Sequence, residues 1–320
     1  MSNINKLNKE FINKLNKIYK EEDLEIIYKW FNCEKRKTSF RVNTIKSSNE
    51  EVIDMLLQND LKVKKVEWLT NAFILLNWDE SDLWKLDLFK NWFIYLQSIS
   101  SQIPVEVLDM KNWTNILDLT AAPWWKTSQV AAKINNTWEI IANDNNSIRI
   151  DKLKFTLDRQ WVKNTKIIKN DARNIINNNS EYIEYFDYII ADLPCSAEWK
   201  FNTNNEKSYA YWSNEVVKKN YKLQKQIMKN IIKSLKKWWE LVYSTCTISP
   251  EENEDICHMI LCNFPEIEIV DLKINYEYSR PWLVNYENKF FKKELNKSVR
   301  ILPSEESEWF FIAKFKKKID

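Results

Sequence analysis

The chain has 320 residues and contains no glycine, whereas an average protein of this length has roughly 20. Glycine most readily adopts the positive φ of tight turns, so its complete absence from a folded chain is unexpected. Tryptophan, which is normally rare, occurs 16 times. Several copies lie in turn-like sequence: Trp124 and Trp125 follow Ala-Ala-Pro, Trp138 follows Asn-Thr, and Trp238 and Trp239 follow Lys-Lys. We predict that most of these tryptophans stand where the natural protein has glycine. The cause would be an AT-rich source genome that reads the codon UGA as glycine, whereas the printed sequence reads the same codon as tryptophan.

Long apolar runs, disulfide patterns and metal-binding clusters are also missing. No apolar run approaches the 18 residues of a membrane span, and the lysine-rich N-terminus lacks the apolar core of a secretory signal. The five cysteines are odd in number and scattered, which favours a reducing compartment over a disulfide framework. Cys257 and Cys262 have a single histidine nearby, His258, which gives too few ligands for zinc. We expect a cytoplasmic protein that contacts no membrane and holds no metal.

The hydrophobic pattern divides the chain near residue 90. Residues 3–31 have helical periodicity, and a strand at 39–43, a helix at 49–59 and a strand at 61–66 follow, which predicts a small α+β module over residues 1–90. Beyond it, short apolar runs alternate with helical stretches. We expect strands at 115–119, 139–143, 166–169, 188–191 and 240–244, and a last strand at 308–314. This alternation is typical of an α/β domain with a mostly parallel, Rossmann-like sheet, here over residues 91–320.

The first strand of that sheet leads into the segment DLTAAPWWKT, residues 118–127, and then into a helix. With glycine at positions 124 and 125, this is a strand, a tight turn and a helix N-terminus, where the backbone can approach a cofactor closely. The segment matches neither the GxGxxG pattern of nicotinamide-binding proteins nor a P-loop. The alternative is a tight turn without a ligand.

Acidic residues follow the next two strands. Asp144 ends the second strand and can accept hydrogen bonds from ribose hydroxyls, and Asp171 follows the third strand, within reach of an adenine edge. Each could instead be a helix cap or a solvated loop carboxylate. Their positions at successive strand ends favour a shared nucleoside site.

Two cysteines follow strands at the same edge of the sheet. Cys195 lies in the segment ADLPCS, residues 191–196, and Cys246 lies in YSTCT, residues 243–247, which SPEENE follows. A buried, inert thiol is the common state of cysteine, but two of them at a ligand-binding edge favour catalysis. Cys33, Cys257 and Cys262 have no such setting, and we expect them to be structural.

These three segments, in this order, resemble the RNA 5-methylcytosine methyltransferases of the RsmB/RsmF/NSUN type, over nearly the whole chain. The resemblance implies a class I S-adenosylmethionine-dependent methyltransferase domain behind an RNA-binding-type N-terminal module, in a monomer. It also implies residues that hold S-adenosyl-L-methionine: Thr120, Ala121, Ala122, Pro123, Trp124, Trp125, Lys126, Asp144, Asp171 and Asp192. The family has glycine where this chain has Trp92, Trp124, Trp125, Trp199, Trp239, Trp282 and Trp309, whereas Trp212 is similar to a family tryptophan.

The resemblance also assigns the two cysteines. The RNA family uses the Thr-Cys cysteine as the nucleophile that attacks carbon 6 of cytosine, which implies Cys246, and Cys195 would then assist proton removal or product release. Enzymes that methylate cytosine in DNA use the Pro-Cys cysteine, which would favour Cys195 instead. A substrate of rRNA or tRNA, a DNA substrate, and an RNA-binding factor without catalysis remain open, and we favour the RNA enzyme.

A row of lysines recurs at steps of three and four residues on a predicted helix: Lys218, Lys222, Lys225, Lys229, Lys233 and Lys236. No acidic residue occurs between Val216 and Trp239. The row is either a solvated helix face or a track for RNA phosphates.

Overall fold

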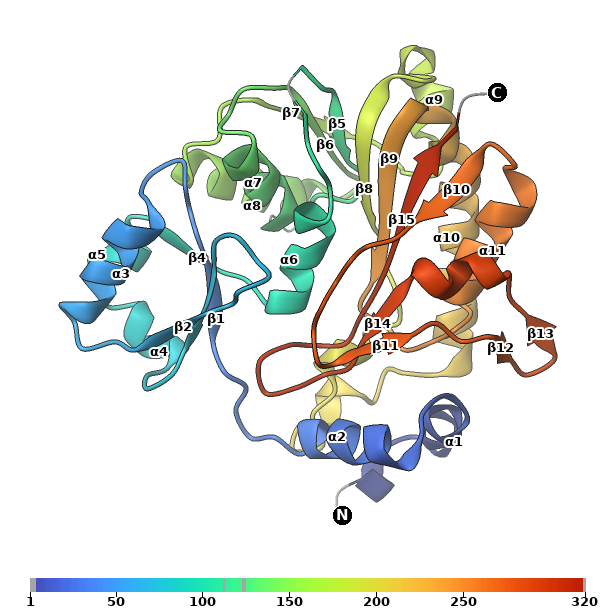
Figure 1. Cartoon of the computed structure of the whole chain (residues 1–320), viewed down its shortest axis with the longest axis horizontal. Coiled ribbons are helices and arrows are strands. Elements are labelled where there is room, and N and C mark those ends of the chain that lie inside the picture. The colour runs from blue at the N-terminus through green and yellow to red at the C-terminus, as the bar shows by residue number, and fades with distance from the viewer. Residues whose placement is uncertain (1–3, 112, 123–124, 319–320) are drawn as a thin grey trace.

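A computed structural model describes residues 4–111, 113–122 and 125–318, and its largest element is a nine-stranded sheet. Five parallel strands form one half: β5 (Ile116–Asp118), β6 (Ile140–Asp144), β7 (Thr165–Lys169), β8 (Phe186–Asp192) and β9 (Leu235–Thr245). The long strand β15 (Phe310–Lys317) pairs antiparallel with β9. Along the sheet the order is β11-β14-β15-β9-β8-β5-β6-β7 (Figure 1). These are the six strands that the apolar runs predict, and the α/β fold is confirmed.

Alternate residues of the central strands face opposite helical layers, as the two-residue period of a strand requires. Leu117 packs in a core with the long helix behind it, whereas its neighbour Ile116 packs in the core on the other face. The first layer contains α9 (Ile175–Asn178), α10 (Asn214–Ile231) and α11 (Glu254–Asn263), and the second contains α6 (Ile99–Glu106), α7 (Trp125–Lys133) and α8 (Ser147–Arg159). None of the described helices is long and apolar enough to cross a membrane.

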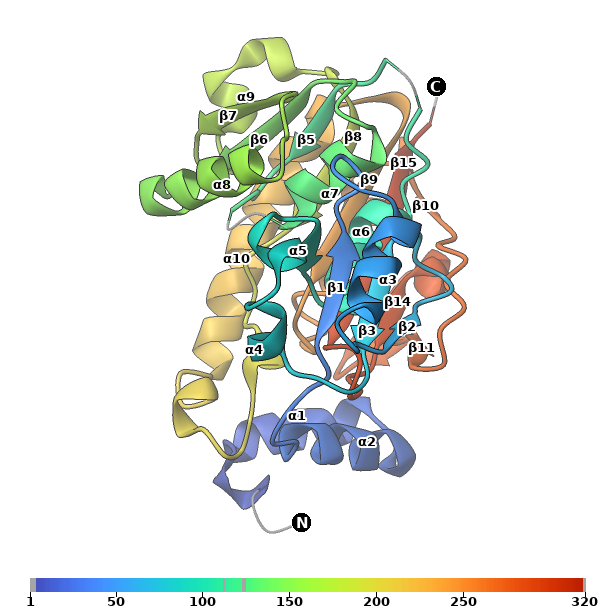
Figure 2. The same cartoon turned by 90° about the vertical axis from the view of Figure 1, so that its left-hand side faces the viewer.

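A second, four-stranded sheet has the order β2-β3-β1-β4 and lies beside the first (Figure 2). Its strands are β1 (Ser39–Val42), β2 (Val63–Lys65), β3 (Ala72–Leu75) and β4 (Ile94–Leu96), with helices α3 (Asn49–Leu57), α4 (Glu80–Leu83) and α5 (Asp87–Lys90). Because β4 pairs with β1, the small sheet extends past the boundary expected at residue 90. Strand β3, which has only four residues, all of them buried, was not predicted from the sequence.

The helical stretch at the N-terminus forms the short 3-10 helix η1 (Ile4–Lys6), α1 (Lys9–Ile18) and α2 (Glu21–Phe31). These helices lie at one end of the molecule, beneath the strand ends and away from the core of the small sheet (Figure 1). Phe11 of α1 and Phe31 of α2 share a buried cluster with Phe201, Trp212 and Ile248 from loops of the large domain. Residues 4–90 therefore form two separately packed parts.

Short elements complete the chain and carry too little pattern to be predicted from sequence. The strands are β10 (Ile267–Val270), β11 (Ser279–Pro281), β12 (Asn285–Tyr286), β13 (Lys289–Phe290) and β14 (Val299–Ile301), and the 3-10 helices are η2 (Ser180–Tyr182), η3 (Glu198–Lys200), η4 (Glu206–Ser208), η5 (Ile232–Ser234) and η6 (Lys293–Lys297). Strand β10 extends the sheet by pairing with β15.

Four of the tryptophans in the described residues have the left-handed backbone that normally selects glycine. The φ angles are 62° at Trp92, 65° at Trp113, 63° at Trp161 and 76° at Trp238. A positive φ is rare for a bulky residue because its Cβ approaches the backbone too closely. Trp113, Trp161 and Trp238 are also exposed, so packing does not compensate for this strain. The backbone thus supports the glycine interpretation at these positions.

Buried tryptophans divide in a similar way. Trp212 is buried, and its indole N–H donates to Glu198 Oε1 at 2.7 Å, as is usual for an indole in a protein interior. Trp30 and Trp309 are equally buried, but their indole nitrogens have no hydrogen-bond partner among the described residues. The contrast agrees with a natural tryptophan at 212 and with glycine at 309.

We expect Trp113→Gly, Trp161→Gly and Trp238→Gly each to stabilise the protein, by about 1 kcal/mol, because each relieves backbone strain without opening a cavity. The control, Trp212→Gly, should destabilise it by about 3 kcal/mol or more, because that side chain is buried and hydrogen-bonded. Urea unfolding monitored by circular dichroism measures all four. A loss of stability in the three exposed variants would contradict the glycine interpretation, as would tryptophan found at these positions by peptide mass spectrometry of the native protein.

Candidate functional site

The segment after β5 lies at the carboxyl edge of the sheet, between β6 and β8. Thr120 Oγ1 donates to the backbone oxygen of Asp192 at 2.7 Å, and the Ala121 amide donates to Asn143 at 2.8 Å. Ala121 and Ala122 are buried. Pro123 and Trp124 lie outside the described residues, as does the side chain of Trp125, whose backbone begins α7. The described part has the strand-to-helix geometry expected for a cofactor loop.

Lys126 and Asp192 form an ion pair at this edge. The Lys126 Nζ lies 2.6 Å from Asp192 Oδ2, and Ser244 Oγ donates to Asp192 Oδ1 at 2.7 Å. Lys126 is almost fully buried, whereas Asp192 keeps 28% of its side chain exposed. These contacts tie the start of α7 to the ends of β8 and β9. They leave one carboxylate fixed, hydrogen-bonded and still accessible.

The two acidic residues expected at a nucleoside site have different surroundings. Asp144 is buried at the end of β6, where it accepts from the Asn146 amide at 2.9 Å and pairs with Arg149 at 3.3 Å. Asp171 is more exposed, and the hydrogen-bonded guanidinium of Arg173 holds the pKa of its carboxyl below the usual range. It borders a cavity of about 590 Å³ that Lys218 and Lys222 also line.

The predicted row of lysines is partly broken. Lys218, Lys222 and Lys229 lie on the exposed face of α10, and Lys233 lies in the following turn. Lys225 is half-buried, with its ammonium 4.9 Å from the centre of the Tyr221 ring. The assignment of Lys236 to the helix was wrong. α10 ends at residue 231, so Lys236 falls in β9, where it pairs with the buried Asp187 at 3.0 Å.

Cys195 and Cys246 meet at the same edge, each in the loop that follows its strand. Their sulfur atoms are 3.1 Å apart, both thiols are free, and both side chains are half-buried. The hydrogen bond with Cys246, burial, and the charges of Cys246 and Glu252 raise the pKa of Cys195 well above its ordinary value. At this distance one sulfur can donate its proton to the other, so the two thiols are coupled.

A buried polar network, which sequence reasoning missed, joins the two cysteine loops from behind. Ser196 Oγ lies 2.8 Å from Thr247 Oγ1 and donates to Glu198 Oε1 at 2.8 Å and to Glu252. Gln224 of α10 also donates to Glu252, at 3.0 Å. Both glutamates are fully buried, and burial together with the charge of Glu198 raises the pKa of Glu252. The only signal in the sequence was the acidic run after Cys246.

Comparison with known proteins identifies the family. The model of the 16S rRNA methyltransferase RsmB/F family matches residues 105–316. The chain belongs to this family. Among its relatives, the tRNA (cytosine(49)-C(5))-methyltransferase of Pyrococcus abyssi is 31% identical over 98% of this chain and 97% of its own length. Ribosomal RNA small subunit methyltransferase F of Pectobacterium carotovorum is also 31% identical, over 71% of this chain and 47% of its own length.

Solved structures agree with this assignment to the RsmB/F family. A methyltransferase homolog protein from Pyrococcus horikoshii is 27% identical, with a TM-score of 0.76 over 98% of this chain and all of that one. NSun6 from the same organism has a TM-score of 0.82 at 21% identity, over 98% of this chain and 99% of that one, which shows a shared fold. The class I methyltransferase fold and the class of RNA 5-methylcytosine methyltransferase, both implied by the resemblance, are thereby confirmed. The chain spans about half the length of the bacterial relatives and nearly all of the archaeal one.

Proposed function

We propose that this chain transfers a methyl group from S-adenosylmethionine to carbon 5 of a cytosine in tRNA or rRNA, through a covalent bond between Cys246 and the base. The observation that carries the proposal is the pair of free thiols 3.1 Å apart at the ends of β8 and β9. This chemistry requires a thiol that attacks carbon 6 and a group that removes the proton from carbon 5, and the second thiol is placed to serve as that group.

The residues at the sheet edge fit S-adenosylmethionine, which supplies an electrophilic methyl group when bound. Asp144 offers a buried carboxylate at the end of β6 that can accept from ribose hydroxyls, and Asp171 follows the neighbouring strand β7. The N-terminus of α7 offers backbone N–H groups beside Ala121 and Ala122. The fixed, accessible carboxylate of Asp192 would lie near the reacting atoms.

Carbon 5 of cytosine is a weak nucleophile, so the ring has to be activated first. The Cys246 thiolate would add to carbon 6, which forms the Sγ–C6 bond and moves electron density onto carbon 5. After methylation of carbon 5, a base removes its proton and the Sγ–C6 bond breaks, which returns the thiolate. The raised pKa of Cys195 supports this assignment, because a thiol that stays protonated is a poor nucleophile.

The base has to leave its stack to reach Cys246, so single-stranded or loop regions of RNA are suitable substrates. The exposed lysines Lys218, Lys222 and Lys229 of α10 are available for phosphate contacts, although they would equally serve a solvated face. Among RNA substrates, tRNA is favoured over rRNA, because the relative that this chain matches over nearly its whole length is named as a tRNA methyltransferase.

The test is methyl transfer from labelled S-adenosylmethionine to separate pools of tRNA, rRNA and DNA, followed by nucleoside analysis. We expect 5-methylcytosine in an RNA pool, with tRNA the better acceptor, and none in DNA. Binding of RNA without any 5-methylcytosine would instead support a non-catalytic RNA-binding factor. A product in DNA alone would contradict the proposed substrate class.

A further inference from the structure

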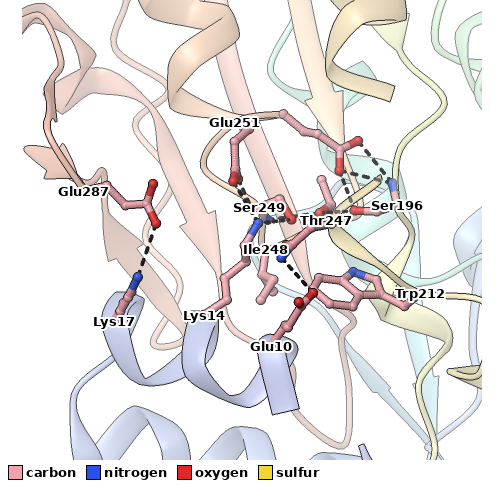
Figure 3. Close-up of polar contacts among 12 residues, drawn as sticks. Glu10, Lys14, Lys17, Ser196, Trp212, Thr247, Ile248, Ser249, Glu251 and Glu287 are labelled. Atoms are coloured by element: carbon pink, nitrogen blue, oxygen red, sulfur yellow. Dashed lines mark hydrogen bonds and ion pairs between the residues drawn. The ribbon is translucent and has the colours of Figure 1, made fainter. Parts of the chain in front are cut away.

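Helix α1 carries two lysines one turn apart, and their environments are opposite (Figure 3). Lys14 has 5% of its side chain exposed, whereas Lys17 has 59% exposed. The ammonium of Lys14 donates to the two carboxylate oxygens of Glu251 at 2.9 and 3.0 Å and lies 3.5 Å from Ser249 Oγ. Lys17 forms an exposed ion pair with Glu287 at 3.2 Å.

The partners of Lys14 belong to the loop that follows the nucleophile. Ser249 lies three residues after Cys246, and its amide donates to Thr247 Oγ1 at 3.0 Å. Thr247 Oγ1 in turn lies 2.8 Å from the hydroxyl of Ser196, the residue after Cys195 (Figure 3). A short chain of hydrogen bonds therefore runs from the N-terminal helix to both cysteine loops.

The positive charge of Lys14 also lies near one of the two buried glutamates, Glu198. Ser249 Oγ donates to Glu198 Oε1 at 3.3 Å, so one hydroxyl separates the ammonium from this carboxylate. Two fully buried carboxyl groups are costly to keep together without a nearby cation. Removal of the ammonium would leave Ser249 free to turn and would weaken the contacts that fix residues 247–251.

Apolar contacts anchor α1 independently of Lys14. The ring of Phe11 lies 4.9 Å from that of Phe201 and 5.1 Å from that of Trp212, measured between ring centres. Phe11 and Leu15 are fully buried. A variant without the ammonium should therefore keep the helix in place while it loses only the polar contact with the loop.

We propose that Lys14 is a positioning residue for methyl transfer, which holds the loop of residues 247–251 so that the Cys246 sulfur faces the base. The inference rests on the proposed role of Cys246 as the nucleophile. Lys14 acts through Ser249 and Glu251 and does not touch the substrate itself.

The experiment compares Lys14→Met, Lys14→Arg and, as the matched control on the same helix, Lys17→Met. Two quantities are measured: kcat and KM for methyl transfer, and the rate of covalent adduct formation with RNA containing 5-fluorocytosine, which lacks the proton that permits release. We expect Lys14→Met to lower kcat and the adduct rate together by about tenfold or more, with KM for S-adenosylmethionine within about twofold. Lys14→Arg should restore most of the rate, and Lys17→Met should match the unmodified protein.

Adduct formation by Lys14→Met at the unmodified rate would overturn the proposal, as would an equal loss in Lys17→Met. If Lys14→Met does not fold, Ser249→Ala replaces it, because this change removes one hydroxyl and should still slow adduct formation several-fold. An unchanged rate in Ser249→Ala would then overturn the proposal. Absence of both adduct and 5-methylcytosine in the unmodified protein would instead reject the proposed function.

Discussion

Replacing Cys246 with alanine should abolish formation of 5-methylcytosine, with a fall in kcat of at least about a thousandfold. Without the thiolate no bond to carbon 6 can form, and carbon 5 keeps the low electron density of the free base. The residues proposed to hold S-adenosylmethionine lie on other loops, so the affinity for it should stay within about twofold. Methyl transfer to tRNA from labelled S-adenosylmethionine measures the first quantity, and calorimetric titration measures the second.

Cys262→Ala is the control for this substitution, because Cys262 is exposed on α11 and its thiol contacts only His258 among the polar groups of the described chain, at 3.5 Å. It should retain full activity. Substantial methylation by Cys246→Ala, combined with none by Cys195→Ala, would reverse the roles of the two cysteines and match the arrangement of the DNA enzymes. Full activity in both variants would exclude a covalent mechanism.

The inner strands of the parallel sheet could be predicted from the sequence because they are buried on both faces and therefore contain short apolar runs. β6 shows this, since all five of its residues are buried. The cysteines could be placed for a related reason: the carboxyl ends of parallel strands meet at one edge, so residues just after β8 and β9 are brought together. The ends of strands are local properties that the pattern records.

What helix α1 packs against could not be predicted in this way. The spacing of Leu7, Phe11 and Leu15 identifies an apolar face but does not say which surface covers it. In the structure this face meets Phe201 and Trp212, nearly 200 residues away along the chain. The polar contact of Lys14 with the Cys246 loop depends on that packing, so it could not be predicted from the sequence either.

The buried carboxyl pair illustrates a second limit of the sequence. Glu198 and Glu252 lie in polar loops, where a glutamate is usually solvated. Their burial results from the convergence of the two cysteine loops with α10, which supplies Gln224. Such a site requires several long-range contacts at once, and none of them leaves a periodic signal.

Replacing Cys195 with alanine should produce a different defect, in which the protein remains bound covalently to RNA. Cys246 is still present, so the Sγ–C6 bond should form and methylation should follow. The base that removes the proton from carbon 5 would be missing, and elimination of the thiol should become the slow step. We expect a protein–RNA complex that survives denaturing gel electrophoresis, in a large fraction of the enzyme, together with a fall in turnover of about a hundredfold or more.

The double variant with alanine at both cysteines is the control and should form no stable complex. A stable complex in Cys246→Ala, but not in Cys195→Ala, would contradict the assignment.

The 3.1 Å contact also explains how Cys195 can be a thiol at first and a base later. Its pKa is raised chiefly by the hydrogen bond with Cys246, and the charge of Cys246 adds to this effect. Once the Cys246 sulfur is bonded to carbon 6, both influences end, so the Cys195 thiol would lose its proton to solvent more readily, and the resulting thiolate would take the proton from carbon 5.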